Sequence, residues 1–208
     1  MNPSNRLKNF VLFTCLFAGP FFLSVGDALW LTRHYNYSWN IWREASCIFF
    51  VPAGFLFAKL GEKKNFKWAM MACALYIIGC FGGATMMSLF RLGAFYPIHG
   101  HNEFPAVVQS VLGQKSFGAT LFLPGLCFPV SLVLFGVFFL KYGLLNWVIG
   151  IAFIVSGIFF WMGNALEIDS VLIIGDIWLL LTFCYAGYII YKDSIALPLR
   201  EMATSINF

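Results

Sequence analysis

Residues 144–191 have the sequence LLNWVIGIAFIVSGIFFWMGNALEIDSVLIIGDIWLLLTFCYAGYIIY, and this stretch is the clearest indication of the fold class. It contains two apolar runs, near residues 144–165 and 171–191, with Glu167 and Asp169 between them. Each run has about 20 residues, the length with which an α-helix crosses the roughly 30 Å hydrocarbon core of a bilayer. The stretch therefore predicts two transmembrane helices, and the short connection makes them antiparallel neighbours.

The composition extends this prediction to the whole chain. Of the 208 residues, 61% are hydrophobic and 11% are charged, and the mean hydropathy is +0.82. Soluble domains have about 25% charged residues, and a soluble fold of this size leaves a large surface that must be covered by polar groups. Four more apolar runs lie near residues 9–30, 42–60, 66–90 and 118–140. We therefore expect an all-α fold, a bundle of six transmembrane helices that forms one domain over residues 1–208 and lies in the lipid bilayer.

The distribution of Lys and Arg predicts the orientation, because cytoplasmic connections carry an excess of both. With the N-terminus inside, nine of the 13 lie on the cytoplasmic side: Arg6, Lys8, Lys59, Lys63, Lys64, Lys67, Lys141, Lys192 and Arg200. The other four lie outside: Arg33, Arg43, Arg91 and Lys115. We expect both termini in the cytoplasm and the protein in the cell membrane, which is the inner membrane if the source is bacterial. The connections explain the net charge of +4, and no surface for nucleic acid is indicated.

Three local features refine this outline. Pro124 and Pro129 lie inside the fourth run, where each removes a backbone donor and predicts a kink that a neighbouring helix must cover. Residues 104–113 lie in the long connection 91–117, and their sequence is typical of either a short interfacial helix or a plain loop. The six cysteines all lie in apolar runs without a C-x-x-C pair, which favours a packing role.

Ionisable residues collect on the predicted outer side. Asp27 and Asp176 lie within the first and last runs, and each follows a glycine, Gly26 and Gly175. A glycine lets another helix approach closely, and an unpaired carboxylate in a membrane span is costly, so we expect each aspartate to face a partner helix or a cavity. The cations on that side are Arg33, Arg43 and Arg91. Asp176 fits a binding or proton-handling role or a structural ion pair, and Glu167 fits the same binding site or a solvated connection.

The segment His99-Gly100-His101-Asn102-Glu103 is a candidate metal site. In an extended chain, His99, His101 and Glu103 project on one side, and this set of side chains is a partial ligand shell for Zn²⁺. Further ligands would have to come from Asp27, Glu167 or Asp176. Solvated histidines in a connection are the alternative interpretation, because a His-x-His pair has low specificity for metal.

These features lead to one main functional hypothesis and two alternatives. We expect a binding or transport component for a small polar molecule or ion, with a site on the outer side built from Asp27, Asp176, Glu167, Arg33 and Arg91. The first alternative is an intramembrane enzyme that uses the His99/His101 segment with a metal. The second is an assembly subunit that docks a membrane-protein partner through the small residues Gly79, Gly82, Gly83 and Ala84. No catalytic motif such as Gly-x-Ser-x-Gly or His-Glu-x-x-His is present in the sequence, which disfavours the enzyme alternative.

Overall fold

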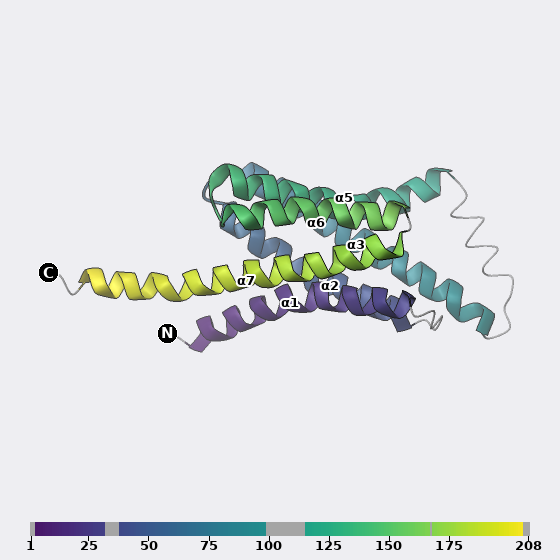
Figure 1. Ribbon diagram of the computed structural model, residues 1–208, viewed down its shortest axis with the longest axis horizontal. Helices are drawn as coiled ribbons and strands as arrows, with labels where there is room; N and C mark the ends of the chain where they lie inside the picture. The colour runs from purple at the N-terminus through teal and green to yellow at the C-terminus, as the bar shows by residue number, and fades with distance from the viewer. Residues whose placement is uncertain (1–2, 32–37, 99–114, 167, 206–208) are drawn as a thin grey trace.

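The computed structural model describes the backbone of residues 3–31, 38–98, 115–166 and 168–205, and within it the side chains of residues 11, 14–31, 39–89, 123–164, 166 and 168–192. These ranges contain helices and no strand, which confirms the all-α prediction. The helices are α1 (Pro3–Leu31), α2 (Ser38–Gly61), α3 (Phe66–Ile98), α5 (Lys115–Tyr142), α6 (Trp147–Leu166) and α7 (Asp169–Ser205) (Figure 1).

Each of these six helices has a stretch that is long and apolar enough to cross a membrane, as the sequence predicts. The stretches are Thr14–Leu31, Trp39–Gly61, Phe66–Leu89, Leu123–Tyr142, Trp147–Asn164 and Asp169–Lys192. The helices themselves are longer than the apolar runs: α3 continues to Ile98 and α7 to Ser205. The reason is that helical hydrogen bonds form within the segment itself, so hydropathy marks the part that suits lipid and not the end of the helix.

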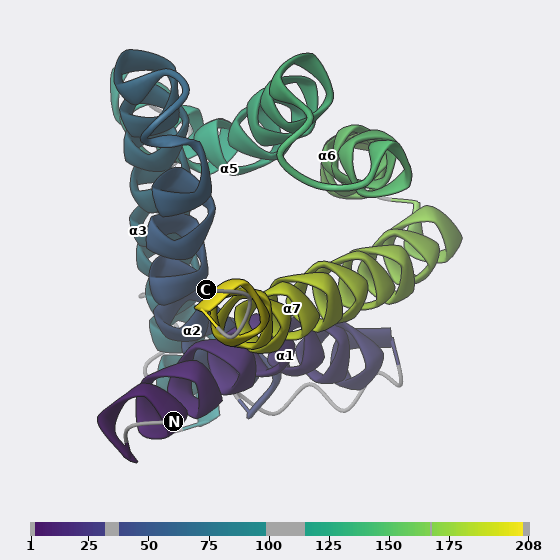
Figure 2. The same ribbon diagram turned by 90° about the vertical axis from the view of Figure 1, so that its left-hand side faces the viewer.

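The helices form a closed ring. Along the ring α1 packs against α2, α2 against α3, α3 against α5, α5 against α6, α6 against α7, and α7 returns to α1. Figure 2 shows α3, α5, α6 and α7 following one another around the bundle. A ring of six helices has an interior that side chains from every helix can reach.

The bundle has two ends, which we name by residues that lie there. The Gly61 end carries the turns at residues 62–65 and 143–146, together with the two chain termini (Figure 1). The Leu31 end is the opposite one, where α1, α3 and α6 finish and α2, α5 and α7 begin. An even number of spans puts both termini at one end of the bundle, and the cytoplasmic location of that end stays a prediction. Residues 104–113, the candidate interfacial helix, lie outside the described residues.

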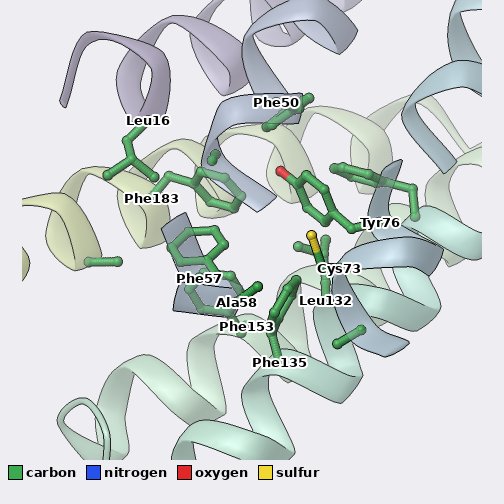
Figure 3. Close-up of a cluster of buried hydrophobic side chains, with 14 of the residues drawn as sticks. Leu16, Phe50, Phe57, Ala58, Cys73, Tyr76, Leu132, Phe135, Phe153 and Phe183 are labelled. Atoms are coloured by element: carbon green, nitrogen blue, oxygen red, sulfur yellow. The ribbon is translucent and has the colours of Figure 1, made fainter. Parts of the chain in front are cut away.

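An aromatic core fills the interior towards the Gly61 end. Its centre is the fully buried ring of Phe57 on α2, whose centroid lies 4.9 Å from that of Phe153 on α6 and 5.3 Å from that of Phe183 on α7. Phe135 of α5 lies 5.6 Å from Phe57, centroid to centroid (Figure 3), and Phe139 of the same helix completes the cluster at 5.9 Å. Because lipid is as apolar as these side chains, their stabilising effect comes from close packing and edge-to-face ring geometry, which is worth about 0.5–1.5 kcal/mol per pair.

Glycines bring the backbones of α3 and α5 into contact. A Cβ on Gly79 would lie 2.3 Å from the backbone nitrogen of Phe128, and one on Gly82 would lie 2.6 Å from the Cβ of Pro124. α5 continues as one helix through Pro124 and Pro129, and α3 covers the turn where the prolines remove backbone donors. These two glycines of α3 therefore pack against another helix of the same chain.

Candidate functional site

A cavity of about 940 Å³ occupies the interior of the ring towards the Leu31 end. All six helices contribute to its wall. The lining residues include Leu23 and Trp30 of α1, Trp39, Arg43, Ser46, Cys47 and Phe50 of α2, Cys80, Met86 and Met87 of α3, Leu126, Phe128 and Pro129 of α5, Phe160, Trp161 and Asn164 of α6, and Asp169 and Leu172 of α7. A volume of this size is typical of sites that hold an organic molecule.

The cavity reaches from the Leu31 end to about the middle of the bundle. Its deepest lining residue on α2 is Phe50, which lies midway between Trp39 and Gly61, the ends of that span. The rings of Phe50 and Phe128 meet at 5.0 Å and form the floor, and Phe50 also contacts Phe183 of the aromatic core at 5.5 Å. The interior therefore has an open half and a closed half that meet near the middle of the spans.

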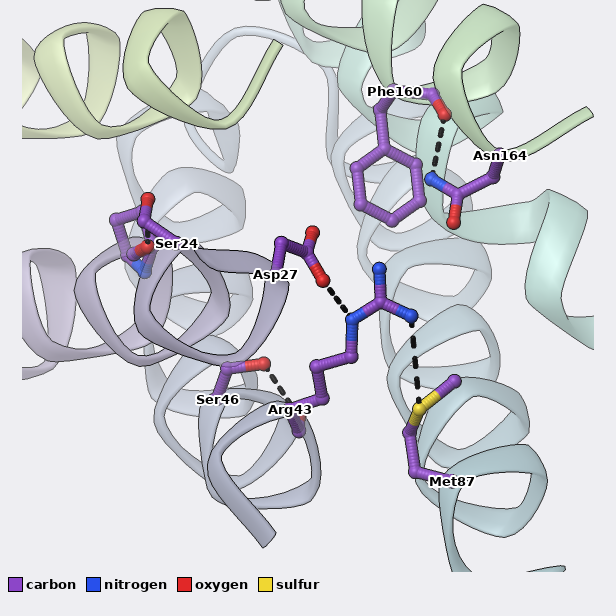
Figure 4. Close-up of polar contacts among 8 residues, drawn as sticks. Ser24, Asp27, Arg43, Ser46, Met87, Phe160 and Asn164 are labelled. Atoms are coloured by element: carbon purple, nitrogen blue, oxygen red, sulfur yellow. Dashed lines mark hydrogen bonds and ion pairs between the residues drawn. The ribbon is translucent and has the colours of Figure 1, made fainter. Parts of the chain in front are cut away.

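Arg43 is the cation in the described wall of this cavity. Its Nε atom donates to Oδ1 of Asp27 on α1 in an ion pair, and the two side chains are 12% and 1% exposed (Figure 4). One terminal nitrogen, Nη1, lies 3.9 Å from the sulfur of Met87, and the guanidinium lies over the ring of Trp39, 5.5 Å from its centroid. The close approach depends on Gly26, because a Cβ there would lie 2.7 Å from Cγ of Arg43.

Asp176 brings a second carboxyl from α7 to the same place. Its side chain is 2% exposed, and it interacts with the carboxyl of Asp27 and with the guanidinium of Arg43. The neighbouring Gly175 packs against α6, where a Cβ would lie 3.2 Å from Cβ of Phe159. The glycine before each aspartate thus allows another helix to approach, as the sequence predicts. We call Asp27, Arg43 and Asp176 the Asp–Arg–Asp cluster.

The cluster contains one cation and two acids, and this count limits its charge. The net charge is zero if one carboxyl carries a proton and −1 if neither does, so it is positive only when both are protonated. Oδ2 of Asp27 and Oδ2 of Asp176 are buried without a hydrogen-bond partner among the described residues. Buried polar atoms normally have partners. Two open acceptor positions beside a guanidinium suit a proton or a water molecule.

Two further buried polar side chains were not identified from the sequence. Asn40 lies one turn before Arg43 on α2, and neither atom of its amide has a hydrogen-bond partner within the described ranges. The ring of Tyr76 packs against the floor residues Phe50 and Phe128, and its buried hydroxyl also has no hydrogen-bond partner within the described ranges. The position of Asn40 directly before an apolar run could have identified it as a buried polar residue. Tyrosine is common in apolar runs, and for Tyr76 the sequence held no signal.

The predicted site residues are brought together in part. Asp27 and Asp176 meet, and Arg43 is the one of the three candidate arginines with a described side chain. The side chains of Arg33, Arg91 and Glu167 lie outside the described residues, so their predicted places in the site stay predictions. Glu44, another acid near the Leu31 end, accepts a hydrogen bond from Ser88 on α3 at 2.9 Å.

The candidate metal ligands His99, His101 and Glu103 also lie outside the described residues. Among the side chains that the structure does describe, no group of three or more His, Cys, Asp or Glu is arranged to hold a metal ion. The zinc hypothesis therefore stays a prediction from sequence.

We compared the chain with protein-family models, with curated proteins and with solved structures, and found no match.

Proposed function

We propose that this protein is a binding or transport component for a small molecule, which enters the cavity from the Leu31 end and is held at Arg43. The observation that carries the proposal is the position of Arg43. It lies in the wall of a cavity of about 940 Å³ and is paired with the buried Asp27, next to the buried Asp176.

A purely structural ion pair explains less of this arrangement. Ionisable side chains in membrane spans are expensive and typically mark the path or site of a ligand or ion. A structural pair needs one carboxylate for one guanidinium, whereas here two acids from different helices converge on one arginine. A cavity also does not stabilise a structural ion pair, because the residues along its wall lose packing contacts.

The one-sided shape of the cavity supports access from a single side of the membrane. The aromatic core around Phe57 closes the Gly61 half, and the floor at Phe50 lies midway along its span. Transporters commonly place their sites near the middle of the membrane, where they are reached from one side at a time. The count of Lys and Arg predicts that the Leu31 end faces outward, so we propose that the ligand enters from outside.

The two alternative functions have less support. A docking surface made of small residues on α3 requires Gly79 and Gly82 to be available to a partner, but both pack against α5 in the same chain. The metal-dependent enzyme rests on His99 and His101, outside the described residues.

The proposal is tested by asking whether a small molecule stays with the protein and depends on the cluster. Protein isolated in nanodiscs is denatured, and its extract is analysed by mass spectrometry. We expect one small molecule per chain that is lost when Arg43→Met is combined with Asp27→Asn, a pair of changes that removes both charges together. The matched control is Glu44→Gln, which keeps an acceptor for Ser88 and lies off the cavity. Equal ligand content in both variants would contradict the proposal.

A further inference from the structure

We infer that the ligand is a neutral, mainly apolar, membrane-soluble molecule that accepts a hydrogen bond from Arg43 through a carbonyl or similar oxygen. The inference deepens the proposed function and rests on it. It departs from the polar molecule or ion expected from the sequence, and the reasons are the lining of the cavity, the charge of the cluster, the donors of Arg43 and a groove beside the cavity.

The wall of the cavity is mostly aromatic and aliphatic. Within the described part of the chain, six aromatic side chains line it: Trp30, Trp39, Phe50, Phe128, Phe160 and Trp161. Two of its polar side chains already donate within their own helices: the hydroxyl of Ser46 to the carbonyl of Arg43 at 2.6 Å, and one of the two amide hydrogens of Asn164 to the carbonyl of Phe160 at 2.8 Å. A ligand that fills this space must therefore be apolar over most of its surface.

The charge of the cluster disfavours an anionic ligand. As long as one carboxyl is ionised, the cluster carries no net positive charge, so a buried anion would lack a compensating partner. A cation is disfavoured by geometry. Asp27 and Asp176 are buried and do not line the cavity, and the carboxylate in its described wall is that of Asp169, in the first turn of α7 at the Leu31 end. A ligand held at Arg43 therefore meets the guanidinium before it meets either carboxylate of the cluster. A neutral group that accepts a hydrogen bond avoids both penalties.

Arg43 has donors to offer such a group. A guanidinium carries five N–H groups. Nε is used by Asp27, and Nη1 faces the sulfur of Met87, which is a weak acceptor at 3.9 Å. In Figure 4 the other terminal nitrogen points towards the side of the cavity where Phe160 and Asn164 lie. An oxygen placed there receives a charge-assisted hydrogen bond, while the body of the ligand lies against the aromatic wall.

A groove on the outside of the bundle adjoins the cavity and fits a ligand that is dissolved in lipid. It has a volume of about 250 Å³, and Val130, Val133, Gly157 and Ile158 of α5 and α6 form part of it. Pro129 and Trp161 belong to the walls of both the groove and the cavity, and the groove is apolar on all sides. A membrane-soluble molecule resting in this groove lies next to the cavity wall.

The test compares four probes that share a chain of similar length and differ in their polar group: undecane, 2-undecanone, decanoate and decyltrimethylammonium. The protein is placed in proteoliposomes with Cys47, in the cavity wall, as its only cysteine. The readout is the rate at which a small, membrane-impermeant methanethiosulfonate modifies Cys47 while each probe is present. We expect 2-undecanone to protect Cys47 best. Undecane should need a roughly tenfold higher concentration for the same protection, since that is about the effect of one hydrogen bond to a charged donor.

The outcomes separate this inference from the proposed function. Strongest protection by decanoate or by decyltrimethylammonium would overturn the neutral class while leaving a ligand site in the cavity. Equal protection by undecane and 2-undecanone would contradict the inference that Arg43 donates a hydrogen bond to the ligand. Protection by none of the four would contradict the inference and the proposed function together. In the combined variant Arg43→Met, Asp27→Asn, the advantage of 2-undecanone over undecane should disappear while undecane still protects.

Discussion

At the scale of single residues, the cluster differs from an ordinary buried ion pair because it holds one acid more than it needs. Asp27 and Arg43 neutralise each other, and Asp176 adds a carboxyl from α7 to a place that is nearly inaccessible. Removing one partner of a buried pair usually costs more than the pair contributes, because the remaining charge is left uncompensated. The two aspartates therefore have different expected roles, although both are buried at the same site.

We expect Asp27→Asn and Asp176→Asn to differ in their effect on stability. Asp27→Asn removes the negative charge that is paired with the guanidinium of Arg43, and should lower the free energy of unfolding by about 3 kcal/mol, the lower end for breaking a buried pair. Asp176→Asn keeps the Asp27–Arg43 pair and its own shape, so its loss should be below about 1 kcal/mol. Denaturant unfolding in detergent micelles measures both values.

Asp176→Asn also distinguishes a binding role of Asp176 from a purely structural one. If Asp176 belongs to the binding site, Asp176→Asn changes the content of bound ligand while stability is kept. A large loss of stability in Asp176→Asn, together with unaltered ligand content, would assign Asp176 to structure alone.

At the scale of helices, glycines at the contacts determine how closely neighbouring helices of the ring approach each other. The contact between α3 and α5 depends on Gly79, which lies against backbone atoms of Phe128 that cannot rotate away. Gly83 lies one turn further along α3, and among the described residues a Cβ there would meet only the sulfur of Cys47, at an ordinary contact distance of 3.4 Å. This difference between two glycines of the same helix makes a matched comparison possible.

We expect Gly79→Ala to destabilise the bundle by about 1–3 kcal/mol, because the added methyl group forces α3 and α5 apart. Gly83→Ala should be neutral or stabilising by up to about 1 kcal/mol, since alanine favours the helix and the methyl group has room. Thermal unfolding of the two purified variants beside the wild type gives the comparison. Equal losses in both would show that α3 and α5 are not in backbone contact at Gly79.

The sequence predicts the number and placement of the spans well, since lipid requires about 20 apolar residues whatever the helices pack against. It does not predict that α7 continues to Ser205, because hydropathy has no bearing on where a helix ends outside lipid. Asp27 and Asp176 were predictable as site residues because a carboxyl is expensive in a span. The choice of Arg43 as their partner, and the burial of Asn40, depend on the order of helices around the ring, which local patterns do not contain.

At the scale of the whole molecule, the ring divides into a half that is closed by aromatic packing and a half that is open. The count of Lys and Arg predicts how these halves are oriented in the membrane. We expect a reporter placed between Lys63 and Lys64, at the Gly61 end, to be found in the cytoplasm, and one beside His101 to be found outside. Reporters at the two positions that both mark the same side of the membrane would contradict the six-span topology.

The division into two halves is tested most directly by native cysteines. Cys47 lines the cavity and is partly exposed, whereas Cys73 is buried among the core residues of the opposite half. Each is kept as the only cysteine in vesicles of known orientation, and a membrane-impermeant methanethiosulfonate is added on the side of the Leu31 end. We expect rapid modification of Cys47 and none of Cys73. Protection of both cysteines, or equal modification of Cys73, would contradict the claim that an open cavity at Arg43 ends in the middle of the bundle.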